Sequence, residues 1–226
     1  MANALEHSRS RIPGLVNPDI FYIPVQTGII ILNGYTGSNP GASTMSITGV
    51  TVGEETDQIM LVLVGNTDTV NSVEWLSENL TLFDTGAGSI ANVSIWYMIN
   101  PPTGTSSIGI QCNANSYIEA AGFLISGVNQ TTPLSDFQTA NGISGNLVVN
   151  TAGTADSIGV SIIKYWDNVG SATVNDVDME YFDSPSSDGS WQSAISVSIG
   201  STSIIHDWIV ATDFNAVLGA CTVNPV

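Results

Sequence analysis

The stretch Ile90-Ala-Asn-Val-Ser-Ile-Trp-Tyr-Met-Ile99 decides the fold class of this chain. Every second residue from Val93 to Ile99 is apolar, which is the period of a β-strand and not of a helix. Trp96 and Met98 make the opposite face apolar as well. A strand that is apolar on both faces is typical of a layer covered from both sides or of a contact with a partner.

Similar runs, rich in β-branched and aromatic residues, recur along the chain. Clusters of Gly, Asn, Asp, Ser and Pro separate them, for example Asn33-Gly34, Ser38–Gly41, Pro101–Gly104 and Ser184–Gly189. Many short strands at a spacing of about 8 to 12 residues favour a sandwich or a barrel. The expected strands are Phe21–Val25, Gly28–Asn33, Met45–Val52, Gln58–Val64, Val70–Leu76, Leu80–Phe83, Ile90–Ile99, Ser106–Cys112, Ile118–Val128, Asn146–Asn150, Ile158–Trp166, Val177–Phe182, Trp191–Ile199, Thr202–Ile209 and Phe214–Thr222.

We therefore expect an all-β protein, a single antiparallel β-sandwich of the jelly-roll-like kind over residues 28–226. One short helical turn is expected near Thr132–Gln138. Residues 1–27 are punctuated by Pro13, Pro18 and Pro24, and we interpret them as an extended N-terminal arm outside the sandwich. The alternative for this segment is a frayed terminus without a role.

The charge composition restricts the partners. The 226 residues include 20 Asp and Glu against 3 Lys and Arg, a formal net charge of −17. Nucleic-acid binding needs many basic side chains to displace phosphate counterions, and attraction to an anionic membrane surface needs them as well. The longest apolar run, Ile29–Leu32, is far shorter than the ~20 residues of a membrane-spanning helix. We expect neither a nucleic-acid partner nor membrane insertion.

The basic residues are unevenly placed along the sequence. Arg9 and Arg11 lie in the predicted arm, and Lys164 is the one Lys or Arg in residues 28–226. Arg9 and Arg11 are therefore the candidate partner-binding residues, because Arg forms close charge-assisted bonds with carboxylates. Glu6, His7, Arg9 and Arg11 also stand where a signal peptide would have its apolar stretch, so no signal peptide is expected.

Catalytic groups are scarce. His206 is followed by Asp207, but no Gly-x-Ser-x-Gly elbow is present, and a strand histidine is the better interpretation. Cys112 and Cys221 are interpreted as buried thiols, with one disulfide as the alternative. Acid pairs suitable for glycoside hydrolysis would be Glu54, Glu55 and Asp57 or Glu74 and Glu78, all of which look solvated. We expect no enzyme and no catalytic residue.

Hard oxygen ligands gather in one segment. Asp176, Asp178 and Asp183 are the candidate ligands for calcium or another cation, with Glu180 between them. Asp176, Asp178 and Glu180 recur with a period of two, however, and this favours a strand that presents acids outward. No cofactor is expected beyond such a cation.

Aromatic side chains offer a second kind of site. Trp75, Trp96 and Trp208 lie within apolar strands and are expected in the core. Trp166 and Trp191 lie at strand ends, next to polar residues, and are the candidate ligand-binding residues for a carbohydrate.

Three stretches resemble a β-sandwich family of phage and archaeal-virus virion proteins and exported microbial surface proteins. They are Met45–Val52, Val93–Gly104 with its Tyr/Trp strand followed by Pro-Pro-Thr-Gly, and Ala120–Leu134 with Ser-Gly-Val-Asn-Gln-Thr-Thr-Pro-Leu. Segments 207–210 and 216–220 resemble the last two strands of that family, and the resemblance covers about residues 44–223. It implies a jelly-roll-like sandwich, and it implies no shared catalytic residues. The chain departs from the pattern in its arm and in the acidic segment 164–200.

The Lys-poor, acidic composition also resembles proteins of salt-loving archaea, since excess acids keep a protein soluble in molar salt. Together these features predict a virion structural protein, such as a capsid decoration, turret or tail-fibre subunit, made in the host cytoplasm and placed on the virion surface. We expect a homo-oligomer whose arm binds other virion proteins and whose surface contacts a host glycan or protein. The alternative is a carbohydrate-binding cell-surface module without catalysis.

Overall fold

The predicted all-β antiparallel sandwich is confirmed. The computed structural model describes residues 29–142, 145–166, 173–174, 179–185, 191–199, 202–210 and 215–226, and within them it contains strands and loops but no helix. Every pair of strands among these residues is antiparallel.

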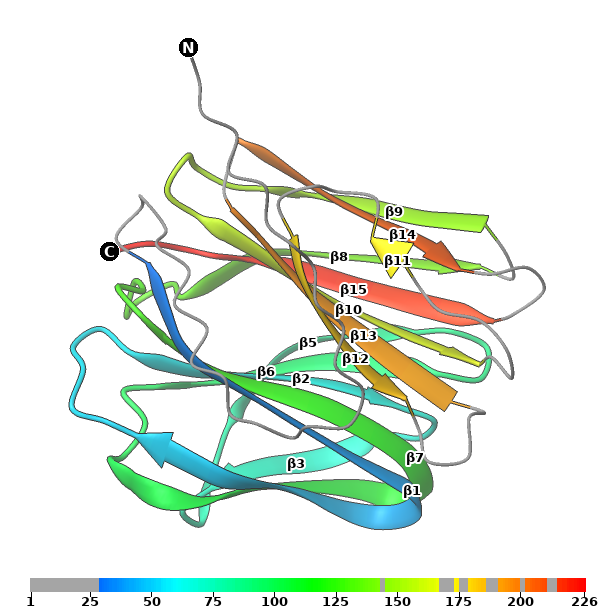
Figure 1. Cartoon of the computed structure of the whole chain (residues 1–226), viewed down its shortest axis with the longest axis horizontal. Coiled ribbons are helices and arrows are strands. Elements are labelled where there is room, and N and C mark those ends of the chain that lie inside the picture. The colour runs from blue at the N-terminus through cyan, green and yellow to red at the C-terminus, as the bar shows by residue number, and fades with distance from the viewer. Residues whose placement is uncertain are drawn as a thin grey trace, which may run out of the picture.

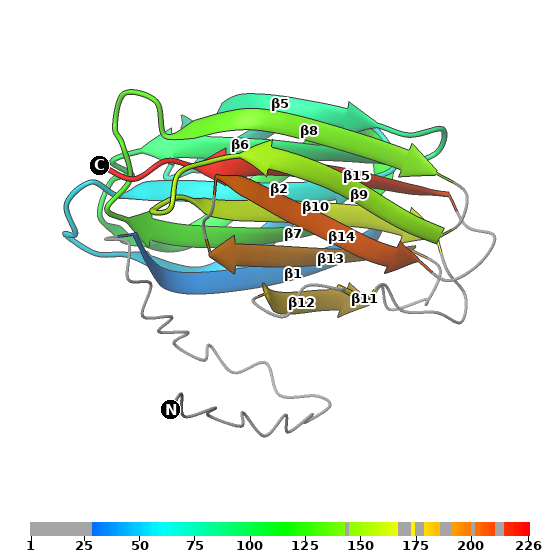
Figure 2. The ribbon, with the colours of Figure 1, turned by 90° about the horizontal axis from the view of Figure 1, so that it is seen from above.

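The strands form three sheets that lie one above another (Figure 1). Seen from above, the strands of the stacked sheets run in nearly the same direction, as in aligned sandwiches (Figure 2). The seven-stranded sheet comprises β1 (Ile30–Val52), β2 (Ile59–Asn66), β3 (Val70–Trp75), β4 (Glu78–Asn79), β5 (Thr81–Ala87), β6 (Asn92–Ile99) and β7 (Gly104–Ser126). The five-stranded sheet comprises β8 (Leu134–Gly142), β10 (Ile158–Trp166), β12 (Met179–Pro185), β13 (Trp191–Ile199) and β15 (Ala216–Val223). The three-stranded sheet comprises β9 (Gly145–Ala152), β11 (Thr173–Val174) and β14 (Ser203–Val210).

The seven-stranded sheet is organised by two long strands, β1 and β7, which pair along almost their whole length. The first half of β7 also pairs with β3 and the second half with β2. The paired strands β1 and β7 bend back on themselves. The bend brings Ile108 close to Gly122 on the same strand, where an added Cβ atom on Gly122 would lie 2.8 Å from Cδ1 of Ile108. The sheet thereby becomes nearly barrel-shaped and encloses apolar side chains.

This ribbon corrects the predicted turns at Asn33-Gly34 and Ser38–Gly41. Both lie inside β1, close to register shifts that mark β-bulges in its pairing with β7. Gly41 has a φ of 76°. The helical turn predicted near Thr132–Gln138 is also wrong. Asn129 Oδ1 accepts hydrogen bonds from the backbone N–H groups of Thr131 and Thr132, and a strand follows directly. A turn at Asn129–Thr132 therefore leads into β8 without a helical turn between them.

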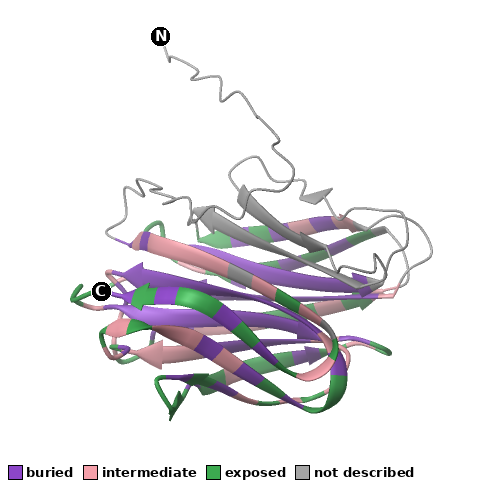
Figure 3. Ribbon diagram, turned by 60° about the horizontal axis from the view of Figure 1, so that its bottom comes forward, coloured by how far each residue is buried: buried purple, intermediate pink, exposed green. Residues whose placement is uncertain are grey.

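Apolar side chains fill three cores, one inside the folded seven-stranded sheet and one between each pair of neighbouring sheets. Figure 3 shows the buried residues of the described strands in purple. Strands β2 and β15 are buried at every residue, since each separates two cores. The buried two-faced strand predicted at 90–99 is likewise confirmed by β6. The first core includes Val62, Trp75 and Ile110; the second includes Leu61, Phe123 and Ile162; the third includes Leu147, Tyr165 and Trp208.

Candidate functional site

Three of the five tryptophans are core residues, as the sequence predicts. Trp75, Trp96 and Trp208 are buried, and each indole N–H has an acceptor. Nε1 of Trp75 donates to the carbonyl oxygen of Pro102 at 3.0 Å, and Nε1 of Trp208 donates to Oγ of Ser161 at 3.0 Å. Nε1 of Trp96 donates to Oγ of Ser94 at 2.8 Å. These indoles are satisfied inside the protein and are not a binding platform.

The two candidate ligand-binding tryptophans occupy opposed positions. The antiparallel register of β10 and β13 pairs Trp166 with Trp191 at the end of the two strands. Their side chains lie outside the described part of the structure, and the register places only their backbones opposite each other. Sequence reasoning selected both residues separately, and only the strand register joins them.

Most of the calcium candidates lie outside the described residues. Asp176 and Asp178 fall outside the described residues, and of Asp183 the structure describes the backbone position on β12. The candidate partner-binding residues Arg9 and Arg11 also fall outside the described residues. Within the described part of the chain, no group of three or more His, Cys, Asp or Glu side chains is arranged to hold a metal ion.

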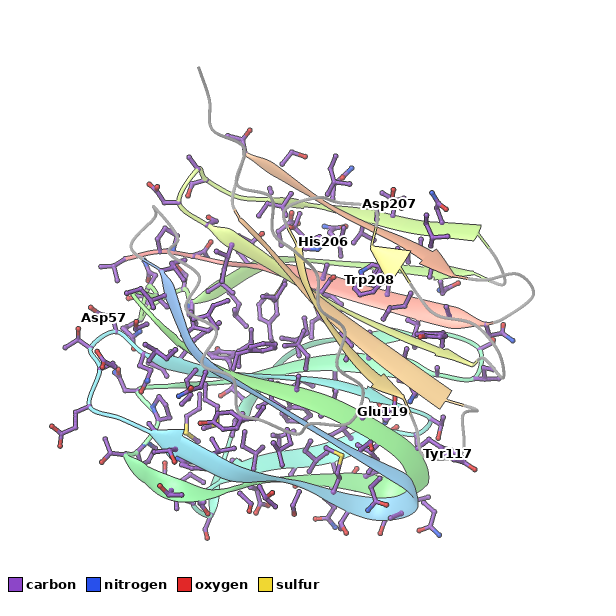
Figure 4. All side chains as sticks on the ribbon, viewed as in Figure 1. Asp57, Tyr117, Glu119, His206, Asp207 and Trp208 are labelled. Carbon is purple, nitrogen blue, oxygen red and sulfur yellow. The ribbon has the colours of Figure 1, made fainter. Side chains whose placement is uncertain are left out.

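His206 lies on β14 in the interface between the three-stranded and five-stranded sheets (Figure 4). Its imidazole is fully buried, and Nε2 is 3.3 Å from Oγ1 of Thr151 on β9. Nδ1 has no hydrogen-bond partner. Gly159 on β10 makes room for the ring, because a Cβ atom there would lie 2.8 Å from Cε1 of His206.

Burial lowers the pKa of His206 from 6.5 to about 4, because the apolar interface disfavours the charged imidazolium. Asp207, the next residue, is partly buried and belongs to the opposite face of the strand by alternation. The arrangement is that of a core histidine without access for a substrate. This agrees with the interpretation of His206 as a strand residue.

An ion pair that sequence reasoning missed lies in the second core. Nζ of Lys164 on β10 is 2.6 Å from Oε2 of Glu119 on β7, and the two side chains are 0% and 2% exposed. Lys164 shares a strand face with Ile158, Val160 and Ile162, which is the face that packs on the seven-stranded sheet. A fully buried Lys is rare unless it is paired.

One sequence signal could have found this pair. Lys164 interrupts a strand whose neighbours, Ile162, Ile163 and Tyr165, are all apolar. A charge in such a run needs a buried partner of opposite sign, because an unpaired ion in the interior costs several kcal/mol. The identity of the partner could not be derived, since Glu119 lies 45 residues away on another sheet.

The two cysteines are free and buried, so the buried-thiol interpretation is confirmed and the disulfide alternative is wrong. Burial raises the pKa of Cys112, and burial also raises the pKa of Cys221 well above its usual range. Burial thus favours the protonated form of both thiols in the folded protein.

The charged side chains on the described surface of the protein are acidic. The basic side chains in residues 29–226 are Lys164 and His206, and both are fully buried. The acids considered for glycoside hydrolysis are solvated as predicted, with Glu54, Glu55, Glu74 and Glu78 exposed and Asp57 partly exposed. Because no basic group compensates them, these carboxylates repel one another at low salt.

No helix in the described residues is long and apolar enough to cross a membrane. Comparison with known proteins gives no assignment, since no family model matches the chain and no curated protein matches it.

Proposed function

We propose that this chain is a non-catalytic structural subunit of a virion surface. The observation that carries the proposal is the placement of its reactive side chains. His206, Lys164, Cys112 and Cys221 are all buried, while the exposed charged side chains among the described residues are acids. A protein with these features is suited to a structural role in a larger assembly. The resemblance of Val93–Gly104 and Ala120–Leu134 to virion β-sandwich proteins supports a virion as the assembly.

The anionic surface sets the conditions for association. Two copies of a body with only acidic exposed charges repel each other unless salt screens them or a basic segment lies between them. Arg9 and Arg11, with His7, are the other basic residues of the sequence, and all lie in the predicted arm. In the proposal, the arm docks on carboxylates of a neighbouring virion protein or of another copy in a homo-oligomer.

Truncation tests this role. A variant that lacks residues 1–12 is expected to fold, because the three cores described above are built from residues between Ile29 and Val223, but to be absent from purified particles. An Arg9→Lys, Arg11→Lys variant is the matched control, since it keeps the charge and loses the bidentate guanidinium geometry. Incorporation of the truncated protein at the wild-type level would refute docking through the arm.

Copy number tests the virion assignment itself. We expect the protein to copurify with particles, in hundreds of copies for a capsid decoration or turret and in a handful for a tail fibre. Failure of the protein to copurify with particles in molar salt would refute the proposal.

The second candidate function is a carbohydrate-binding module at a cell surface. It is favoured by the register that opposes Trp166 and Trp191 at one strand end, because aromatic side chains are the usual contacts for sugar rings. It predicts saturable glycan binding that is lost in Trp166→Ala and in Trp191→Ala. Leu82→Ala is the control, since Leu82 is an exposed apolar residue on β5 of the other sheet. The absence of binding on a glycan array in high salt would exclude this function.

A further inference from the structure

Lys164 and Glu119 place an amine and a carboxyl group in direct contact inside a closed core. We propose that these two side chains condense into an intramolecular isopeptide bond, an amide between Nζ of Lys164 and Cδ of Glu119. The bond joins β10 of the five-stranded sheet to β7 of the seven-stranded sheet, the two strands labelled in Figure 1.

The first argument is proximity. Nζ lies 2.6 Å from Oε2, the oxygen bonded to the carbon that the amine would attack. Groups held in contact in a fixed orientation react as if at a very high local concentration. Both backbones are fixed here by strand ladders on either side, since Glu119 pairs with Ser38 and Gly65 and Lys164 pairs with Ser193 and Val217.

The second argument is the cost of the charges. Removing an ammonium and a carboxylate from water is expensive, and mutual attraction repays it incompletely. Transfer of one proton from Nζ to Oε2 along the contact converts the pair into a neutral amine and a neutral acid. This is also the reactive form, because the amine regains its lone pair and the acid gains a leaving group.

The reaction then balances without any further reagent. The Nζ lone pair attacks Cδ, and a tetrahedral centre forms. The C–O bond breaks, the hydroxyl group takes a second proton from Nζ, and one water molecule leaves. The ammonium and the carboxylate have become a neutral amide, and no electron is gained or lost.

The third argument is the environment of the product. The side-chain exposures of 0% and 2% leave almost no access for solvent, and the surrounding second core is apolar. A water molecule released there leaves an interior that solvent hardly reaches, so hydrolysis lacks its reactant. A cross-link between the two sheets suits a long-lived surface subunit whose two cysteines are free.

The sequence makes the test unusually clear. Trypsin cleaves after Lys and Arg, and beyond Arg11 the chain offers it Lys164 alone. Denatured protein with a free Lys164 yields fragments 12–164 and 165–226. Acylated Lys164 resists cleavage, so the cross-linked protein is expected to leave residues 12–226 as one piece, lighter than its sequence by one water molecule. Fragmentation of that piece is expected to show a branch between Glu119 and Lys164.

Two variants control the experiment. Lys164→Arg keeps the charge and the trypsin site but loses the nucleophilic amine, and Glu119→Ala removes the carboxyl group. Both variants are expected to be cleaved after residue 164 and to have the mass calculated from their own sequences. Because the digestion uses denatured protein, this result does not depend on whether the variants fold. Complete cleavage of aged wild-type protein at Lys164 would overturn the proposal, and so would resistance to cleavage with an unchanged or increased mass.

Discussion

Acidification is expected to loosen the interface between the three-stranded and five-stranded sheets through His206. The imidazole has a pKa of about 4 in the folded protein against 6.5 in the unfolded chain. The unfolded state therefore binds the proton more readily between these two values, and stability falls as the pH falls. The contribution is fully present above pH 6.5 and is lost progressively down to about pH 4.

The size follows from the same two values. Each pH unit between them changes the free energy of unfolding by about 1.4 kcal/mol, so the whole interval contributes about 3 kcal/mol. Nδ1 of His206 has no hydrogen-bond partner. The groups packed against the ring include Thr151 on β9, Gly159 on β10 and Ile204 on its own strand, none of which carries a charge. No carboxylate among these neighbours compensates a proton on the ring.

Urea unfolding at pH 7, 6, 5 and 4.5 in constant molar salt measures the effect, with His206→Leu as the comparison. Carboxylates titrate in both proteins, so the difference between the two profiles isolates the histidine. Wild type is expected to lose stability relative to His206→Leu by about 1.4 kcal/mol per pH unit below pH 6.5. Parallel profiles would refute the reasoning. So would an NMR titration of the wild-type imidazole with a midpoint near 6.5, a measurement that needs no variant.

Three other predictions concern the cores and the surface. Lys164→Met leaves the buried Glu119 without the ammonium of Lys164. This variant is expected to be less stable than the double variant Lys164→Met, Glu119→Leu by about 3 kcal/mol. Neither variant can form the proposed amide, and equal unfolding midpoints in urea would contradict the prediction. Gly159→Ala would place a Cβ atom 2.6 Å from Cγ2 of Ile204 and is expected to cost about 1 to 3 kcal/mol, whereas Gly109→Ala, whose Cβ meets nothing within 4 Å, is the neutral control in the same assay. The thermal unfolding midpoint is expected to rise steadily from low to molar KCl, because salt at about 1 M screens charges beyond about 3 Å; a midpoint that is independent of salt would show that repulsion among the acids is negligible.

Local pattern was sufficient for the fold class. The alternation at 90–99 and the mostly apolar run Ile158–Trp166 both predict strands, and both strands form. Local pattern was insufficient for strand ends. Asn33-Gly34 and Ser38–Gly41 have turn composition, yet β1 continues through them because pairing with β7 satisfies the backbone on both sides of each bulge.

Some features of the candidate sites also follow from local sequence, and others depend on tertiary structure. Burial of Cys221 agrees with its mostly apolar neighbours in sequence, burial of Cys112 agrees with the general tendency of free Cys to be buried, and the exposure of Glu54 and Glu55 agrees with their polar neighbours. The contact of Lys164 with Glu119, the contact of His206 with Thr151 and the register of Trp166 with Trp191 join residues from different strands. No local pattern carries that information, since it depends on which strands become neighbours.

By itself the sequence determined that this chain is an antiparallel β-protein with an acidic surface, because alternation and charge are properties of residues and their immediate neighbours. Only the tertiary structure decided that its one lysine would lie against a glutamate between two sheets. The physical reason is that stacking the sheets brings distant strand faces together in an interior that excludes water, and there a pair of opposite charges becomes a potential covalent bond.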